Sequence, residues 1–219
     1  MPLPNVVSQD DWQQAIDELR AEEKKLTQLS DEINAKRRAL PMVRIDKSYE
    51  FDGPDGKSTL LDLFDGRSQL IVYHFMFGPD EEAGCPGCSW VTDAMTHPAH
   101  LNARDISLAL ISRAPIENIV KFRERMGWTL PWYSSFGSEF NYDFNATNDH
   151  GENHVTSVFM RDGDEIFRTY YTDNRGVEYL GSHYTYLDLT PYGRQEDWEV
   201  SPEGWPKGDK FWTRHHDRY

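Results

Sequence analysis

The feature that most restricts the fold of this chain is a buried strand that runs into a pair of closely spaced cysteines. Residues 69–77 form an apolar run interrupted by His74, as is typical of a central strand covered on both faces. A Cys-Pro-Gly-Cys motif follows at residues 85–88 and opens a segment long enough for a helix, residues 85–95. These are the chain's two cysteines, and random placement would produce this spacing about once in 100 chains. Strand, loop, dithiol and helix therefore form one unit.

The position of the motif at a helix start predicts its chemistry. A thiol there meets the positive end of the helix dipole and unpaired backbone N–H groups, and both favour the nucleophilic thiolate. A second thiol one turn later can attack a mixed disulfide and release the substrate. We therefore expect thiol–disulfide exchange with Cys85 as the nucleophile, Cys88 as the resolving thiol and no cofactor. Trp90 is a candidate for the border of a substrate groove, although an aromatic side chain here also suits the core.

The rest of the chain alternates between strand-like and helix-like patterns. Two Asp/Gly turn signals indicate a hairpin at residues 49–57, and the Arg-Asp-Gly-Asp turn at residues 161–164 indicates another. Further expected elements are strands at residues 107–112, 132–135, 155–160 and 165–171, a helix at 115–126, a long loop at 136–154 and a poorly periodic stretch from residue 175 onward. This order predicts an α/β fold with a mixed central sheet flanked by helices.

The N-terminal segment has the pattern of one long amphipathic helix. Ser8 and Asp11 make a capping box, and the pattern ends before a proline. The seven-residue repeat is carried by Trp12, Leu19, Leu26, Ile33 and Leu40, and it is widened by Ile16 and Leu29. Glu23, Ser30 and Arg37 interrupt the second row, which argues against an extended coiled coil. We expect this stripe to be buried against the chain's own domain or against a symmetry mate, which would give a homodimer.

Charge and composition exclude several kinds of partner and compartment. The chain has 23 basic and 37 acidic residues and a net charge of −14, so nucleic acid and anionic membranes are not expected partners. The longest apolar run is far shorter than the roughly 20 residues that span a bilayer, and the N-terminus lacks the features of a signal peptide. We therefore expect a cytoplasmic protein with an N-terminal helix (residues 1–40), a main domain (41–198) and a C-terminal tail (199–219).

Several segments together resemble a known group of proteins. They are LPMVRIDKSYEF, GCPGCSW, FNYDF, SVFMRDGDEIFRTYYTDNRG and YLDLTPYGRQED. Residues 49–77 are similar to the entry of the alkyl-hydroperoxide-reductase and thiol-specific-antioxidant branch of the thioredoxin superfamily. The set as a whole spans about residues 8–198 and more closely resembles a family of predicted dithiol–disulfide oxidoreductases. The resemblance implies a thioredoxin-like fold and a redox-active cysteine pair that exchanges with a protein or small-molecule disulfide and a thiol reductant.

Departures from the related families limit what the resemblance implies. Thioredoxins have Trp before the first cysteine, where this chain has Gly84, and they have Gly and Pro in the opposite order within the motif. Glu82 stands where peroxiredoxins place a Thr, and Thr156 stands near the place of their Arg and of the thioredoxin cis-Pro. We therefore expect weak hydroperoxide reduction. Thr156 is a candidate for substrate binding through its backbone.

Acidic residues next to the motif add a second expectation about the nucleophile. Residues 80–82 are Asp, Glu and Glu, and nearby carboxylates raise a thiol pKa. These carboxylates should therefore oppose the effect of the helix terminus on Cys85, unless the loop bends away.

Two other classes of function remain open at this point. Cys85, Cys88, His97 and His100 supply the two thiolates and two imidazoles of a tetrahedral zinc site, although the spacing between the pairs is shorter than in zinc fingers. The second class is a non-catalytic interaction protein, because the C-terminal region is rich in Tyr and Trp, which could cover a partner or a ligand. His215 and His216 lie in a terminal run that we expect to be mobile.

Overall fold

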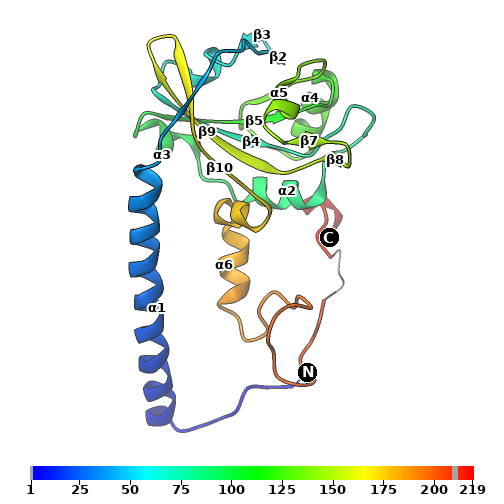
Figure 1. Cartoon of the computed structure of the whole chain (residues 1–219). Coiled ribbons are helices and arrows are strands. Elements are labelled where there is room, and N and C mark those ends of the chain that lie inside the picture. The colour runs from blue at the N-terminus through cyan, green and yellow to red at the C-terminus, as the bar shows by residue number, and fades with distance from the viewer. Residues whose placement is uncertain (1, 209–211) are drawn as a thin grey trace.

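The computed structural model describes residues 2–208 and 212–219, and within them one mixed sheet has eight strands (Figure 1). In spatial order the strands are β1 (Val43–Ile45), β10 (Glu165–Asp173), β9 (Val155–Asp162), β4 (Gln69–His74), β5 (Ile106–Ser112), β6 (Trp132–Ser134), β2 (Glu50–Gly53) and β3 (Gly56–Thr59). β4, β5 and β6 are parallel, whereas β9 and β10 run antiparallel to their neighbours. A separate short pair joins β7 (Thr147–Asn148) and β8 (Gly151–Glu152).

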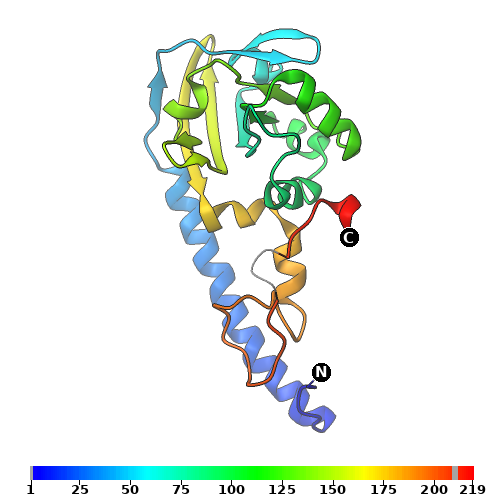
Figure 2. The same cartoon turned by 90° about the vertical axis from the view of Figure 1, so that its right-hand side faces the viewer.

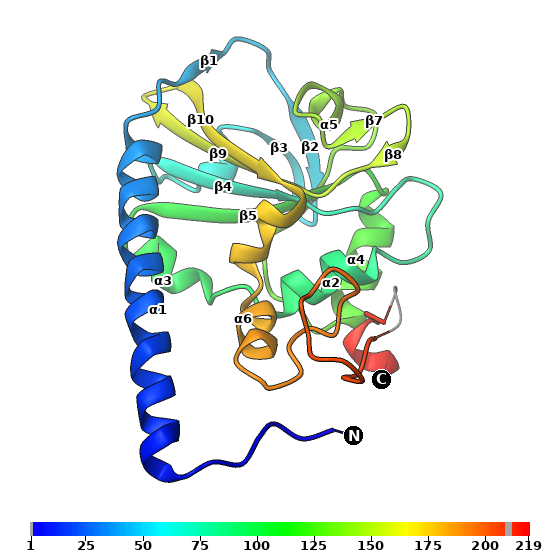
Figure 3. The same ribbon diagram turned by 60° about the horizontal axis from the view of Figure 1, so that its bottom comes forward.

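Helices cover both faces of the sheet (Figure 3). The helices of the described residues are α1 (Gln9–Arg38), α2 (Pro86–Asp93), α3 (Pro98–Asn102), α4 (Ile116–Arg125), α5 (Phe140–Asp143) and α6 (Ser182–Asp188), with 3-10 turns η1 (Asp62–Phe64), η2 (Asn174–Leu180) and η3 (His216–Arg218). Side chains of α2, α4 and η2 share one hydrophobic cluster, and side chains of η1 and α5 share another. The dithiol helix α2 therefore packs on the same face as α4 and η2.

The central strands confirm the expected fold. β4 leads through α2 to the parallel strand β5, and the antiparallel hairpin β9–β10 then adds to the other side of β4. This order, β10-β9-β4-β5 with the helix after β4 on one face, is that of a thioredoxin-like fold. The predicted mixed α/β sheet is thus correct, and so are the hairpins β2–β3 and β9–β10.

β4 is central because its sequence is apolar on both sides. Leu70 and Val72 point into the cluster with η1 and α5, whereas Tyr73 points into the cluster with α2 and α4. All three side chains are fully buried. The backbone of β4 pairs with β5 on one side and with β9 on the other. A strand paired on both edges and covered on both faces gives α2 a rigid base.

The structure corrects two expectations for regions without clear periodicity. The predicted loop 136–154 contains α5 and the β7–β8 pair. The stretch after residue 175 was expected to be irregular, but it forms η2 and α6, and Val177 enters the core at 3% exposure. Segments of four to seven residues are too short for a period to be visible.

Helix α1 forms where the sequence predicts it, but it does not pack as expected. Ser8 is its N-cap and accepts a hydrogen bond from Asp11 N at 3.1 Å. The helix projects away from the sheet (Figure 1, Figure 2), and no side chain of α1 is buried by the described part of the chain. Trp12, Leu19 and Leu26 are 50%, 54% and 67% exposed. The prediction that the stripe packs against its own domain is therefore wrong.

Every helix within residues 2–208 and 212–219 is either too short or too polar to cross a bilayer.

Candidate active site

The first cysteine lies at the start of α2, where the sequence analysis placed it. Cys85 is the N-cap residue and Pro86 occupies the first turn. Cys85 N donates to Met76 O at 2.9 Å, and Ser89 N donates to Cys85 O at 2.9 Å. The loop after β4 therefore returns to its own strand extension before the helix begins. This tether holds the thiol at the positive end of the helix.

A close approach of the backbone explains the glycine before the motif. Gly84 is buried, and a Cβ placed on it would lie 2.4 Å from a ring carbon of Phe75 and 3.0 Å from one of Phe122. Both rings belong to the core around α2. The Trp that thioredoxins have at this position therefore cannot be accommodated, because the aromatic rings beneath it already fill the space.

The surroundings of Cys85 favour its thiolate. The pKa of Cys85 is lowered to about 6, first by a hydrogen bond with the Cys88 side chain and then by the backbone N–H groups of Cys88 and Gly87. Burial acts in the opposite direction, and so does Glu81, whose contribution is the smallest of these. Glu81 thus opposes the lowering of the Cys85 pKa, as expected of the acidic loop, but the hydrogen bonds to the thiolate outweigh it.

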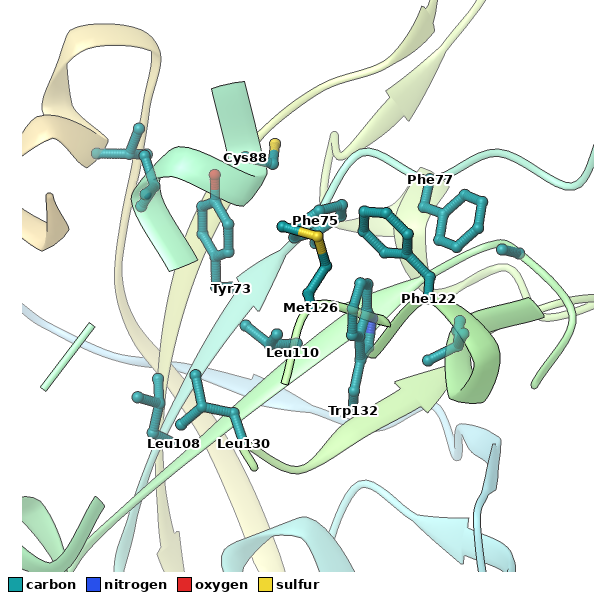
Figure 4. Close-up of a cluster of buried hydrophobic side chains, with 14 residues drawn as sticks. Tyr73, Phe75, Phe77, Cys88, Leu108, Leu110, Phe122, Met126, Leu130 and Trp132 are labelled. Carbon is teal, nitrogen blue, oxygen red and sulfur yellow. The ribbon is translucent and has the colours of Figure 1, made fainter. Parts of the chain in front are cut away.

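The second cysteine has the opposite environment. Cys88 is 2% exposed, and burial, followed by its interaction with Cys85, raises its pKa well above the usual range. The phenol of Tyr73 rises from β4 toward α2 beside this thiol (Figure 4). Burial and then Cys88 raise the pKa of Tyr73 as well. Among the described residues, the Tyr73 hydroxyl has no partner at the distance and angle of a hydrogen bond. The phenol is thus a neutral donor next to the Cys88 thiol.

A cavity of about 440 Å³ opens beside the two thiols. Its walls come from the end of β4, from α2, from the residue before β9, from η2 and from α6. The lining residues are Tyr73, Met76, Cys85, Gly87, Cys88, Val91, His154, Asn174, Arg175, Val177, Glu178 and Tyr184. Cys85 therefore faces a concave surface, and five of its twelve lining residues belong to the segment that follows the last strand.

An arginine whose side chain is 10% exposed holds this C-terminal wall together. Arg194 donates to Glu178 at 2.8 Å and to Asp188 at 2.6 Å, and its guanidinium lies 4.6 Å from the centre of the Tyr184 ring. Arg175 pairs with Glu178 from the other side at 2.8 Å. The two arginines lower the pKa of Glu178, even though its burial acts in the opposite direction. The ion-pair network thus links η2, α6 and the segment after them.

The C-terminal end docks beside the motif, and it was expected to be mobile. His215 Nε2 donates to Gly84 O at 2.8 Å. His216 Nδ1 lies 2.8 Å from Asp93 at the end of α2, and Asp217 forms a two-bond ion pair with Arg125 of α4. The terminal residues therefore contact both ends of α2. No run of hydrophobic residues in the sequence signals these contacts, since they depend on single side chains.

The two candidate substrate-binding residues lie away from the cavity. Thr156 is 4% exposed and sits between β4 and β10, paired with Tyr73 and Thr172. Its backbone is occupied on both sides, and His154, two residues earlier, is at the cavity wall instead. The Trp90 ring stacks on His183 at 4.5 Å and meets Trp212 edge-on at 5.3 Å. Trp90 therefore anchors the C-terminal region.

The alternative zinc site is not assembled. Among the described residues, no group of three or more His, Cys, Asp and Glu side chains is placed to hold a metal ion. His97 instead caps α3, and its Nδ1 accepts a hydrogen bond from Ala99 N at 3.2 Å. Cys85 and Cys88 are free thiols in this structure.

Comparisons with known proteins identify a family and several distant structural likenesses. Residues 1–219 match the family described as bacterial protein of unknown function, DUF899. No curated protein matches the chain. Peroxidoxin BcpB from Mycobacterium tuberculosis is 15% identical, with a TM-score of 0.49 over 66% of this chain and 90% of its own.

Two further solved structures are similarly distant. A mutant of PrxQ from Xylella fastidiosa is 14% identical, with a TM-score of 0.45 over 63% of this chain and 88% of its own. A secreted disulfide oxidoreductase from M. tuberculosis, homologous to E. coli DsbE, is 12% identical, with a TM-score of 0.37 over 57% and 83%. Likenesses this distant do not indicate an activity.

Proposed function

This chain belongs to the DUF899 family of bacterial proteins of unknown function, and we propose that it is a thiol–disulfide oxidoreductase with Cys85 and Cys88 as its redox-active pair. One observation carries the proposal: the two thiols have opposite environments. The pKa of Cys85 is lowered to about 6, and that of the buried Cys88 is raised. A thiolate at neutral pH with a protonated partner behind it is the arrangement needed for stepwise exchange.

The proposed reaction has two displacement steps. The Cys85 thiolate attacks one sulfur of a substrate disulfide, forms a mixed disulfide and releases the other sulfur as a thiolate. Cys88 then loses its proton and attacks Cys85, which forms the Cys85–Cys88 disulfide and releases the second substrate thiol. The substrate gains two electrons and the cysteine pair loses them. An external dithiol or two monothiols restore the reduced pair by the same steps in reverse order.

Tyr73 has a supporting role in the second step. Its hydroxyl is buried next to Cys88, and no other described residue forms a hydrogen bond with it. A neutral phenol donates a hydrogen bond to a thiolate, so it stabilises Cys88 at the moment when Cys88 must be deprotonated. Tyr73 is thus proposed as a positioning residue for the resolving thiol.

Reduction of hydroperoxides is the weaker alternative. Glu82 lies exposed on the loop before the motif, and Thr156 is buried within the sheet, so neither supplies a donor to a bound peroxide. Arg175 lines the cavity, but its guanidinium is paired with Glu178. Turnover of hydrogen peroxide is therefore expected to be slow compared with the exchange of thiols and disulfides.

A redox titration tests the proposal directly. The protein is equilibrated with mixtures of reduced and oxidised glutathione, and its free thiols are then alkylated and counted by mass. The expected result is a two-electron transition to an intramolecular disulfide. A pair that stays reduced at every ratio, or that takes up one glutathione on each cysteine, would contradict the proposal.

A further inference from the structure

The long helix α1 presents an apolar stripe that the described residues of its own chain leave exposed. Trp12, Leu19, Leu26, Leu29 and Ile33 of α1 are all at least 43% exposed. The space beside Leu26, between α1, α3 and α6, is a cavity of about 880 Å³. Within α1 the stripe recurs over three heptads from Trp12 to Ile33, and Leu40 continues it two residues beyond the helix end. Three to four heptads is the length typical of paired helices.

Charge along α1 is divided between its two halves. Residues 9–23 carry six carboxylates and one arginine, whereas residues 24–38 carry five basic residues and two carboxylates. The helix dipole favours acidic residues only in the first turn and basic residues only in the last turn, so it does not explain a division of charge between the two halves. The division extends through the middle of the helix, where Glu22 and Glu23 are followed directly by Lys24 and Lys25.

We propose that α1 pairs antiparallel with the α1 of a second copy of this chain along the stripe. In that orientation the acidic half of each helix lies beside the basic half of the other, and Trp12 of one copy lies near Leu40 of its partner. A parallel pair would place acidic beside acidic and basic beside basic. Both orientations bury the apolar stripe, so the charges select between them.

The pairing also accounts for the polar residues that interrupt the seam. Glu23, Ser30 and Arg37 occupy the second row of the stripe. Polar residues at such positions lower stability but specify orientation and register. In the antiparallel pair, Glu23 in the acidic half of one helix lies along the basic half of the other, and Arg37 lies along the acidic half. Most of the stability of an amphipathic helix in a protein comes from the packing of its apolar face, and this arrangement removes both stripes from solvent at once.

Two double variants test whether the stripe forms the interface. Leu19→Asp/Leu26→Asp places two carboxylates on the stripe, and Ala21→Asp/Gln28→Asp places two at the same spacing, about 200° further round the helix. Mass is measured by light scattering on the full chain at micromolar concentration. We expect a dimer for the wild type and the control variant, and a monomer for the stripe variant. Circular dichroism shows whether each variant retains its helix content. A monomeric wild type, or a stripe variant that stays dimeric, would overturn the proposal.

Cross-linking tests the orientation. Gln13→Cys and Ala39→Cys are made separately in a Cys85→Ser/Cys88→Ser background, so that each protein carries one thiol near one end of α1. A short bismaleimide should link the two variants only when they are mixed, because residue 13 of one copy then lies near residue 39 of the other. Cross-linking of either variant with itself would indicate a parallel pair, and cross-linking in neither experiment would exclude the antiparallel helix pair.

Discussion

Helices α1 and α2 differ in length, in burial and in what fixes them. α1 has 30 residues, and none of them is buried within the described chain. α2 has eight residues, of which Cys88, Ser89, Val91 and Thr92 are buried. Both begin at a defined cap, at Ser8 and at Cys85. The comparison shows that capping and periodicity decide where a helix forms, whereas contacts from distant parts of the chain decide where a reactive group can be held.

The largest expected effect comes from the nucleophile in α2. Cys85→Ser should abolish exchange, because Cys88, the other thiol at the cavity, is only 2% exposed and its raised pKa keeps it protonated. Cys88→Ser should instead stop the reaction at the mixed disulfide, since the first attack remains available and the second does not. The measurement is mass spectrometry after incubation with a small aromatic disulfide. Trapping on Cys88 in the Cys85→Ser protein would reverse the assigned roles.

The next effect concerns the packing beneath α2. Gly84→Ala should lower the free energy of unfolding by about 1–3 kcal/mol, because its Cβ meets the buried Phe75 ring and the core cannot relax freely. Gly87→Ala is the control in the same motif, since a Cβ there would lie 3.7 Å from Cys85 Sγ, an ordinary contact. Denaturant unfolding should leave Gly87→Ala within about 1 kcal/mol of wild type. Equal losses in the two variants would show that the Phe75 contact does not matter.

The pH dependence of the thiols provides a third test. Alkylation of Cys85 should reach half of its maximal rate near pH 6, because the pKa is lowered to about 6 from a usual value of 9.0. The lowered pKa means that the folded state binds its proton less tightly than the unfolded state does. Cys85 therefore contributes stability fully above pH 9, and the contribution is lost as the pH falls toward 6. Unfolding of reduced wild type and Cys85→Ser at pH 6, 7.5 and 9 should show their difference growing with pH. A midpoint of alkylation near pH 9 would exclude the thiolate assigned to Cys85.

A smaller effect is expected from the phenol under the resolving thiol. Tyr73→Phe keeps the buried ring and removes the hydroxyl next to Cys88, so resolution of the mixed disulfide should slow about 3- to 10-fold, as expected for the loss of one hydrogen bond worth about 1 kcal/mol. The rate of alkylation at Cys85 should not change. Single-turnover kinetics with a chromogenic disulfide separate the two steps. If both steps slowed equally, the hydroxyl would have a general structural role.

The smallest effect is expected in α1. Leu19→Asp/Leu26→Asp should leave the rate of exchange per chain unchanged, because neither side chain lines the 440 Å³ cavity beside the thiols. The same variant changes the mass of the particle if the helices pair, so one protein separates assembly from chemistry. A loss of exchange comparable to that of Tyr73→Phe would mean that the second copy contributes to the active site.

The sequence predicted the parts of the structure that depend on local signals. The apolar run of β4, the helix after the Cys-Pro-Gly-Cys motif and the two hairpins were all expected, because periods, caps and turn residues act over a few positions. The cavity wall was not expected. η2 and α6 contain no repeating apolar pattern, and they are held by the ion pairs of Arg194 with Glu178 and Asp188. The residues of such pairs come close only in the folded chain, so no local pattern in the sequence predicts them.

The position before β9 shows a second limit of sequence analysis. Thr156 was a candidate substrate contact, but it is His154 that lines the cavity. The difference is two residues, which is the usual uncertainty in the start of a strand. A shift of two positions keeps a side chain on the same face of a strand, but here it moves the residue from the interior of the sheet to its end. The functional role of Thr156 therefore stays a prediction without a cavity contact to support it.

The wall that η2 and α6 build beside the thiols has a consequence for how the protein can diversify. The reacting sulfurs belong to one short stretch after β4, whereas Asn174, Arg175, Glu178 and Tyr184 belong to a stretch after the last strand. Substitutions in the later stretch can reshape the entrance without altering the strand, the cap or the thiol pair. We therefore expect proteins that share this dithiol but act on different substrates to differ in residues 174–194 rather than around the cysteines.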